Sequence, residues 1–504
     1  MGFYHSTRSA SPTFTSKEAI RRGIAPDGGL FVSDDLGGTT IDISTLANKD
    51  YPTLAREVMG ALLPDYSADE IAACVDEAYT GTFASNEVTP LVPLSQAPNA
   101  DGTPTYVMEL FGGPTSAFKD VALQMLPRLM ARTAGAEGER IMIVTATSGD
   151  TGKAALAGFA DAPGCGITVF YPEGKVSHVQ NLQMSTQEGA NVAVCAVRGN
   201  FDDAQTAVKQ IFANKELGER LAAGGTILSS ANSINVGRLV PQVVYYFAAY
   251  AQLLRAGAIQ VGDAVEFCVP TGNFGDILAG YYAKRMGLPV AKLLVASDKN
   301  NVLADFLATG TYDRERPFYT TTSPSMDILV SSNLERMLYY LAEGDCELVA
   351  DLMSKLTDEG NYQIPAELLE RIRTVFDGGW ADEDQVAAAI RRCWDENGYV
   401  IDPHTACGYH VMEQTAAVEG TACRVLLSTA SPYKFPKAVA EALGLFCPPD
   451  DFACMEVLAK HTGTTAPVQL AELKTKPVRF EDVVDVADMG SYVEQAANRI
   501  AEEA

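Results

Sequence analysis

Short apolar runs alternate with helical periods through most of the chain after about residue 90. Several of these runs are continuously apolar rather than alternating, and they fall at residues 140–145, 166–171, 191–197, 265–269, 292–296 and 424–428. Strands that are apolar on both faces are typical of a parallel sheet covered by helices on each side. The pattern therefore predicts an α/β fold with parallel sheets flanked by helices.

The pattern also divides the chain. Residues 1–90 have helical and acidic periods around a Gly28-Gly29 turn, which predicts an N-terminal helical domain. Residues 91–445 form the predicted α/β core. Within that core, residues 344–399 read as helical, polar and acidic without a strand, so we expect a helical insertion there. Residues 446–504 are predicted to form a C-terminal region that packs on the core.

Composition and charge exclude several kinds of partner. The chain has 504 residues, of which 47% are hydrophobic, enough for a large core in more than one domain. Its formal net charge of −26 repels nucleic acid and anionic membranes. No secretory signal precedes the first polar turn, and the most apolar helical stretch, 239–254, contains Pro241 and is too short to span a bilayer. We expect a cytoplasmic protein with no nucleic-acid or membrane partner.

Cysteine and histidine spacing adds two further expectations. The ten cysteines form no Cys-x-x-Cys pair, and Cys195 and Cys268 lie within apolar runs, so we expect reduced thiols. None of the five histidines has metal-ligand spacing, so no metal site is predicted.

Lys119 is the strongest candidate for covalent chemistry. It follows the turn-forming pair Gly113-Pro114 and small hydroxyl residues, and it lies between Phe118 and Asp120. Neighbours of this kind can desolvate an amine and hold it in place, which suits Schiff-base formation with a carbonyl group.

A first candidate anion site follows the apolar run at 140–145. The loop Ser148-Gly149-Asp150-Thr151-Gly152 leads into an Ala-rich helix, whose free N–H groups would bind an anion together with the hydroxyls of Ser148 and Thr151. An ordinary strand-to-helix turn remains the alternative, because a Gly-rich turn alone is a weak signal. A P-loop is improbable, because it needs glycine where Thr147 stands and Ser or Thr where Ala154 stands.

Two later loops have the same position after an apolar run. Gly272, Asn273, Phe274 and Gly275 precede a helix, and their successive amides would wrap a phosphate. The loop Ser428-Thr429-Ala430-Ser431-Pro432 ends the run at 424–428, and a hydroxyl in this loop could face a pyridine nitrogen. Taken alone, a loop of this kind is more often an ordinary structural turn than a ligand-binding site. Three such loops at the carboxyl ends of strands, together with Lys119, favour a shared site for pyridoxal phosphate (PLP).

A polar cluster before the apolar helix at 239–254 is a candidate for substrate recognition. Asn232, Asn235 and Arg238 belong to it, and its structural interpretation is a helix cap with loop hydrogen bonds. Its functional interpretation is recognition of a doubly charged ligand, because Arg238 offers a forked cation inside an acidic protein.

The sequence resembles the longer-chain branch of the threonine synthase family. The similarity covers nearly the whole chain and is most specific at Asn232-Ser233-Ile234-Asn235 and Ser325-Met326-Asp327-Ile328. Further matching motifs are Tyr4-His5-Ser6-Thr7-Arg8, Ile24-Ala25-Pro26-Asp27-Gly28-Gly29-Leu30, Ala117-Phe118-Lys119-Asp120, Ser148-Gly149-Asp150-Thr151-Gly152, Gly272-Asn273-Phe274-Gly275-Asp276, Asp402-Pro403-His404-Thr405-Ala406 and Lys434-Phe435-Pro436.

The resemblance implies a tryptophan-synthase-β type of PLP fold and conversion of O-phospho-L-homoserine and water to L-threonine and phosphate. It implies that Lys119 carries PLP covalently and acts as the base, that residues 272–275 hold the cofactor phosphate, and that Thr429 contacts the pyridine nitrogen. Ser148, Thr151, Asn232, Asn235 and Arg238 are the candidates for substrate binding, and Asp150 has no assigned role. We expect a monomer or a homodimer. A PLP-dependent threonine or serine ammonia-lyase and a catalytically silent PLP-binding protein remain the alternatives.

Overall fold

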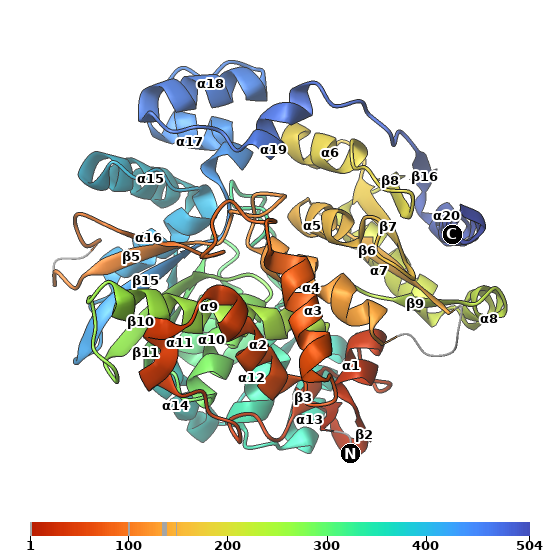
Figure 1. The fold of residues 1–504 in the computed structure, drawn as a ribbon, viewed down its shortest axis with the longest axis horizontal. Coiled ribbons are helices and arrows are strands. Elements are labelled where there is room, and N and C mark those ends of the chain that lie inside the picture. The colour runs from red at the N-terminus through yellow and green to blue at the C-terminus, as the bar shows by residue number, and fades with distance from the viewer. Residues whose placement is uncertain (1–2, 99–100, 134–138, 148, 504) are drawn as a thin grey trace.

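Two parallel sheets organise the fold, the larger to the left and the smaller to the right in Figure 1. The computed structural model describes residues 3–98, 101–133, 139–147 and 149–503. Helices separate most consecutive strands and cover both sheets, so the predicted α/β class with parallel sheets is confirmed. No helix in the described ranges is both long and apolar enough to cross a membrane.

The larger sheet is parallel except at one edge, where the short strand β4 pairs antiparallel with β5. Its order is β14-β11-β10-β15-β5-β4. The strands are β4 (Leu91–Pro93), β5 (Thr105–Glu109), β10 (Ala264–Pro270), β11 (Val290–Ser297), β14 (Phe376–Trp380) and β15 (Thr421–Ser428). The interior strands β10 and β15 are almost completely buried, which explains their continuous apolar runs.

The smaller sheet is parallel throughout and has the order β16-β8-β7-β6-β9. Its strands are β6 (Arg140–Ala146), β7 (Cys165–Pro172), β8 (Val192–Arg198), β9 (Thr226–Ser229) and β16 (Val483–Asp485). The apolar runs predicted at 140–145, 166–171 and 191–197 coincide with β6, β7 and β8.

The helices of the core follow the strands in sequence. They are α4 (Lys119–Ala131), α5 (Asp150–Phe159), α6 (His178–Ser185), α7 (Phe201–Ala213), α8 (Lys215–Ala223), α9 (Val236–Arg255), α10 (Gly275–Arg285), α11 (Val302–Thr309), α12 (Leu334–Leu341), α13 (Cys346–Asp358), α14 (Ala366–Val375), α15 (Glu383–Asn397) and α16 (Pro403–Gln414). The longest of them, α9, is buried along nearly its whole length and contacts α2, α4 and α10. It therefore joins the N-terminal region to the core.

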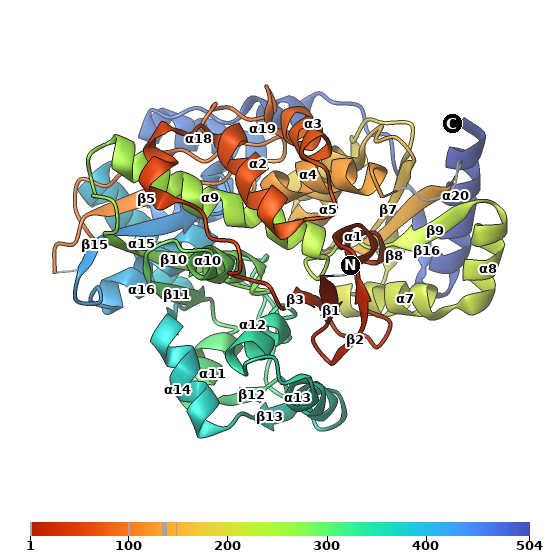
Figure 2. The same ribbon diagram turned by 60° about the horizontal axis from the view of Figure 1, so that its bottom comes forward.

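The N-terminal region contains a sheet as well as the predicted helices. Its helices are α1 (Ser16–Arg22), α2 (Tyr51–Leu62) and α3 (Ala68–Tyr79), with a 3-10 helix η1 (Ile43–Asn48). Strands β1 (Tyr4–Ser6), β2 (Ser9–Phe14) and β3 (Phe31–Ser33) form an antiparallel sheet near the N-terminus in Figure 2. The purely helical prediction for residues 1–90 is wrong here, because β1 and β3 have only three residues each and carry no readable period.

The prediction that residues 344–399 contain no strand is also wrong. The segment includes β13 (Asn361–Gln363), which pairs with β12 (Thr311–Asp313), and β14, which forms the edge of the larger sheet. Strand β14 has the sequence Phe-Asp-Gly-Gly-Trp, and two glycines leave it without an apolar run. The helices α13 and α14 and the β12–β13 pair project at the bottom of Figure 2.

The C-terminal region runs from the larger sheet to the smaller one (Figure 1). It contains α17 (Pro436–Ala442), α18 (Asp451–Thr462), α19 (Val468–Ala471), α20 (Met489–Glu503), strand β16, and the 3-10 helices η2 (Pro432–Lys434), η3 (Glu472–Lys474) and η4 (Val486–Asp488). Strand β16 pairs with β8, so the end of the chain packs on the smaller sheet. The domain boundaries at 90 and 445 stay a prediction.

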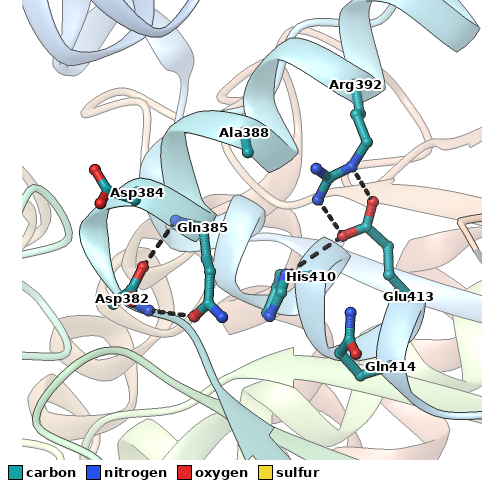
Figure 3. Close-up of a pocket in the computed structure, with 8 residues that line it drawn as sticks. All are labelled: Asp382, Asp384, Gln385, Ala388, Arg392, His410, Glu413 and Gln414. Carbon is teal, nitrogen blue, oxygen red and sulfur yellow. Dashed lines mark hydrogen bonds and ion pairs between the residues drawn. The ribbon is translucent and has the colours of Figure 1, made fainter.

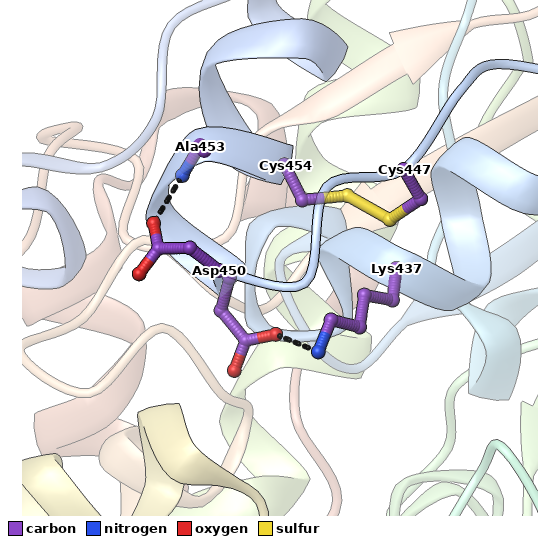
Figure 4. The surroundings of a disulfide bond; sticks show 6 residues. Lys437, Cys447, Asp450, Ala453 and Cys454 are labelled. Carbon is purple, nitrogen blue, oxygen red and sulfur yellow. Dashed lines mark hydrogen bonds and ion pairs between the residues drawn. A yellow bond between two sulfur atoms is a disulfide. The ribbon is translucent and has the colours of Figure 1, made fainter.

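A disulfide joins Cys447 to Cys454 at the start of α18 (Figure 4). Asp450 caps this helix by accepting from the amide of Ala453, which brings the two cysteines to a Cα–Cα distance of 5.5 Å. The expectation that all ten cysteines are reduced is therefore wrong for this pair, whose seven-residue separation the Cys-x-x-Cys test does not detect. The other eight cysteines are free, and Cys195 and Cys268 are buried as expected.

Candidate active site

Lys119 is the first residue of α4 and its amine is almost completely buried. The Nζ atom donates to Ser325 Oγ at 3.1 Å and lies 4.9 Å from the centre of the Phe118 ring. Burial lowers the pKa of Lys119 to about 8, although Asp150 nearby favours the charged form. A pKa near 8 leaves roughly one amine in ten uncharged at pH 7. Lys119 can therefore act as a nucleophile and as a base.

Asp150 begins α5 and lies on the same side of the site. Its two oxygens lie 2.7 Å from Lys434 Nζ and 3.9 Å from Lys119 Nζ, and one of them also accepts from Gln180 Nε2 at 3.0 Å. Burial alone would raise the pKa of Asp150, but Lys434 and Lys119 hold it below its ordinary value. The carboxyl group is consequently ionised, and the positive charge of Lys434 balances its negative charge.

Ser325 connects Lys119 with a buried histidine. Its hydroxyl accepts from Lys119 and donates to Asp150 Oδ2 at 3.3 Å, while its amide donates to His404 Nε2 at 3.1 Å. On the other side of the ring, His404 Nδ1 lies 2.6 Å from Asp402, the residue that caps α16. Asp402 therefore orients His404, and His404 fixes the segment that places Ser325 beside the amine.

The loop Gly272–Gly275 lies at the N-terminus of α10 and presents unpaired amides. The N–H groups of Gly272, Asn273, Phe274 and Gly275 donate no hydrogen bond to any residue that the structure describes. A Cβ atom at Gly272 would lie 2.8 Å from the carbonyl oxygen of Ser325, so no other residue fits there without a shift. The cradle can hold the phosphate of PLP, and the close approach of its backbone explains the glycine.

Asp276 follows the cradle, and its carboxyl would repel a bound phosphate if it were ionised. The hydroxyl of Tyr246 donates to Oδ1 at 3.1 Å, and Tyr245 donates to the same oxygen. Burial raises the pKa of Asp276 to about 7, so much of the group is neutral at neutral pH. Burial thus makes this carboxyl compatible with an anion in the cradle.

Thr429 follows β15 and lies beside the loop that carries Lys119. Its carbonyl oxygen accepts from the amide of Phe118 at 2.8 Å. The residue is 5% exposed, and no hydrogen bond joins its hydroxyl to another described residue. A nearly buried hydroxyl of this kind fits a ring nitrogen of PLP as its partner.

Arg238 on α9 is a buried cation that lacks a carboxylate partner. One guanidinium nitrogen donates to the carbonyl oxygen of Ala231 at 3.1 Å, but Nε has no hydrogen bond. No ion pair involves Arg238 within the described part of the chain, and burial lowers its pKa to about 10. Its charge also lowers the pKa of Lys119. An uncompensated buried guanidinium is costly, and an anionic ligand would remove that cost.

Three further residues are predicted to bind the substrate, namely Asn232, Thr151 and Ser148. Asn232 accepts from Thr145 Oγ1 at 2.7 Å, at the end of β6. Thr151 lies in the first turn of α5, and neither its amide nor its hydroxyl bonds to another residue of the described ranges. Ser148 lies outside the described residues, so its role stays a prediction.

The assignment of Asn235 to substrate binding is not supported by its contacts. The side chain caps α9 by accepting from the amide of Gly237, and its NH₂ group donates to the carbonyl oxygens of Ile20 and Ser230. Asn235 is fully buried, and both of its amide hydrogens are used. Its role is to fix the start of α9 against the N-terminal region, which is the structural interpretation of the cluster.

Sequence reasoning missed three residues that complete the site, namely Ser325, His404 and Lys434. All three lie in motifs on which the family resemblance rests, but no chemical role followed from their local sequence. Sequence reasoning also missed Asn333, which lies outside those motifs. Its NH₂ group donates to the carbonyl oxygens of Ser233 and Asn273. It thereby ties the polar cluster before α9 to the phosphate cradle.

A separate hollow of about 500 Å³ lies between α15 and α16 (Figure 3). Arg392 donates to both oxygens of Glu413, and His410 Nδ1 lies 3.4 Å from the same carboxyl group. Arg392, Glu413 and His410 thus contact one another, and none of the site residues lines the hollow.

A buried lysine beside a free amide cradle, in two parallel sheets, defines a class of PLP-dependent α/β enzyme. The family model described as "Pyridoxal-phosphate dependent enzyme" matches residues 83–428. The models "Threonine synthase N terminus" and "Threonine synthase, C-terminal" match residues 3–79 and 405–493.

Individual relatives agree with these models. Threonine synthase of Schizosaccharomyces pombe is 39% identical over 88% of this chain and 90% of its own length. Human threonine synthase-like 1 is 39% identical over 84% of this chain, and the matched region is only 58% of the human protein. The PLP-bound threonine synthase structure from Brucella melitensis has a TM-score of 0.85 and 38% identity, and the match covers 99% of this chain and 100% of that one. The chain belongs to the threonine synthase family.

Proposed function

We propose that the protein converts O-phospho-L-homoserine and water to L-threonine and phosphate, by PLP-dependent γ-elimination followed by addition of water at the β-carbon. The observation that carries this proposal is the buried guanidinium of Arg238, which has no counter-ion among the described residues and whose charge lowers the pKa of the nucleophilic amine of Lys119. In a chain with a net charge of −26, such a group fits a substrate that brings its own anionic groups.

The cofactor would be held by residues that the fold brings together. Lys119 would bind it covalently, the amides of residues 272–275 would hold its phosphate, and Thr429 would contact its ring nitrogen. When bound, PLP supplies an electron sink that stabilises negative charge on the substrate carbons.

Lys119 performs the proton transfers in this proposal. Its amine accepts the proton from the substrate Cα and later returns one, because a lowered pKa leaves a useful fraction uncharged near neutral pH. The Ser325 hydroxyl and the Asp150 carboxylate hold the amine between these transfers. Lys434 keeps Asp150 neutralised, so that a negative charge can remain this close to an anionic substrate.

Substrate anions are assigned to Arg238 and Asn232 and to the start of α5. Arg238 binds the substrate phosphate, with the amide of Asn232 as a second donor. The free amides at the start of α5, together with the hydroxyl of Thr151 and with Ser148, form a second anion site.

The assay that tests the proposal measures phosphate release and threonine formation from O-phospho-L-homoserine by the purified holoenzyme. We expect equal amounts of both products. Release of ammonia from threonine or serine, without phosphate release from phosphohomoserine, would identify a threonine or serine ammonia-lyase. PLP absorbance without turnover of any of these substrates would identify a catalytically silent protein.

Replacing Thr429 with aspartate should change how the reaction partitions. The new carboxylate would favour protonation of the ring nitrogen, which strengthens electron withdrawal and should shift the cofactor absorbance. We expect less threonine and more side product per substrate consumed. Thr429→Ser, which keeps a hydroxyl, is the matched control. An unchanged spectrum and product ratio in Thr429→Asp would show that this residue does not contact the ring.

Replacing Ser325 with alanine should lower kcat about fivefold with little change in KM, the effect of one lost hydrogen bond of about 1 kcal/mol to the amine. PLP content should stay at the wild-type level. Ser323→Ala is the matched control, because the Ser323 hydroxyl contacts Asp298 rather than Lys119. Equal effects of the two substitutions on kcat would show that Ser325 supports only the loop.

For location and assembly, we propose a cytoplasmic monomer or homodimer. Seven of the eight free cysteines are buried, as suits a reducing compartment, while the Cys447–Cys454 bond argues against it. Cell fractionation and sedimentation of the purified protein test both points.

A further inference from the structure

A hollow of about 540 Å³ lies where four parts of the chain meet. Its lining includes Phe83 from the N-terminal region, Pro114 from the loop before Lys119, Lys153 on α5, Gln183 on α6, and Gln469 and Lys476 from the C-terminal region. We call this hollow the lysine pocket. Figure 1 shows α19, which carries Gln469, beside α6. The volume is that of a site for a small ligand.

The lysine pocket is separate from the proposed catalytic centre. None of the residues assigned to PLP or to the substrate lines it. The loop 112–114 forms part of its wall, and Lys119 does not line it. A ligand of the lysine pocket therefore need not be the substrate.

Two lysines in the lining, Lys153 and Lys476, form no ion pair within 4 Å with a residue that the structure describes, although one carboxylate, Glu188, also lines the hollow. Lys153 Nζ donates to the side-chain oxygen of Gln187. Burial lowers the pKa of Lys153 to about 8; Asp120 and Glu188 oppose this shift, while Lys476 and Lys434 add to it. The two lysines outnumber the single carboxylate of the lining, and this local positive charge in a protein of net charge −26 favours an anionic ligand.

Gln183 adds an unsatisfied acceptor to the same wall. Its side chain is 1% exposed, and its Oε1 atom has no hydrogen bond. The orientation of the amide is fixed, because Nε2 donates to the carbonyl oxygen of Thr115 at 3.2 Å and a flipped amide would face that oxygen with its own. A ligand with a hydroxyl or ammonium hydrogen would satisfy Oε1.

We propose that the lysine pocket binds a small carboxylate or phosphate that also carries a hydrogen-bond donor. The lysines Lys153 and Lys476 hold the anionic group, and Gln183 accepts from the donor. This requirement for both features distinguishes the site from a general anion-binding surface.

Isothermal titration of the purified holoenzyme tests the proposal with L-malate, succinate and inorganic phosphate as probes. Malate and succinate have the same two carboxylates, but only malate has a hydroxyl. We expect malate to bind about 2- to 10-fold more tightly than succinate, the effect of one neutral hydrogen bond. Gln183→Leu should remove this preference. Phosphate shows whether the site also accepts a tetrahedral anion.

Two lysine substitutions locate the binding. Lys153→Met and Lys476→Gln should each weaken malate binding about 10- to 100-fold, as expected for a lost charge-assisted contact, and should leave phosphohomoserine turnover unchanged. Lys476 is partly exposed, so its substitution tests the site even if Lys153→Met fails to fold. Arg238→Ala, which affects the catalytic centre, should leave malate binding intact.

Three results would overturn the proposal. The first is that none of the three probes binds to the wild-type holoenzyme. The second is that Arg238→Ala abolishes malate binding while both lysine variants retain it, since the anion would then occupy the catalytic centre. The third is that a folded lysine variant with normal PLP content loses turnover together with malate binding, which would make the lysine pocket part of the substrate site.

Discussion

Lys119→Ala is expected to lower turnover of O-phospho-L-homoserine by about three orders of magnitude or more, since a positioned general base alone typically contributes about 10²- to 10⁴-fold. The substitution removes both the covalent anchor for PLP and the group that carries protons to and from the substrate. The visible absorbance of the lysine–cofactor linkage should disappear with the activity. Absorbance spectra and steady-state kinetics on one preparation measure both effects.

Lys292→Ala is the matched control for this substitution. Lys292 lies on β11 of the larger sheet, and its amine donates to the carbonyl oxygen of Arg373 at 2.7 Å rather than to any residue of the site. We expect it to keep wild-type absorbance and turnover. Substantial phosphohomoserine turnover by a Lys119→Ala enzyme of native circular dichroism would refute the assignment of the base.

The interior of the fold could be predicted from the sequence because burial on both faces leaves a continuous apolar run. Strands β6, β7, β8, β10, β11 and β15 are interior strands or have apolar neighbours on both faces, and each has such a run. Edge strands lack this signal. Strand β14 contains two glycines and β16 has three residues, so only their pairing with β11 and β8 identifies them.

The candidate site shows the same limit at the level of single residues. Lys119, the cradle 272–275 and Thr429 could be named as candidates from the sequence. Lys119 begins a helix after a Gly-Pro turn, and the other two follow strands in loops rich in glycine or hydroxyl residues. Ser325 and Lys434 could not, because their importance lies in distances to Lys119 and Asp150 from segments far away in the chain. Asn235 shows the opposite case, since a cap and a ligand-binding amide have the same local sequence.

For Arg238, the sequence identified a candidate but could not decide between a helix start and a ligand-binding residue. Its position after the Asn-Ser-Ile-Asn motif made it a candidate, but the motif is equally compatible with a plain helix start. The structure adds the observation that separates these cases: Arg238 is 3% exposed, has one nitrogen without a hydrogen bond, and forms no ion pair within the described residues. A guanidinium buried only for packing is expected to have its nitrogens bonded by the protein. Arg424 pairs with Glu266, and Arg336 donates to the carbonyl oxygens of Phe31 and Ile234 and to the side chain of Asn333.

Arg238→Ala should therefore reduce kcat/KM for phosphohomoserine about 30- to 1000-fold, corresponding to about 2 to 4 kcal/mol of transition-state stabilisation from a charge-assisted contact. PLP occupancy should stay near the wild-type level, because the cofactor phosphate has its own cradle at residues 272–275. Arg238→Lys retains a charge without the fork and should lie between the two enzymes. The decisive measurement is PLP content by absorbance beside kcat/KM on the same preparation. If PLP content and kcat/KM fall together, Arg238 only supports the start of α9; if neither falls, the substrate phosphate binds elsewhere.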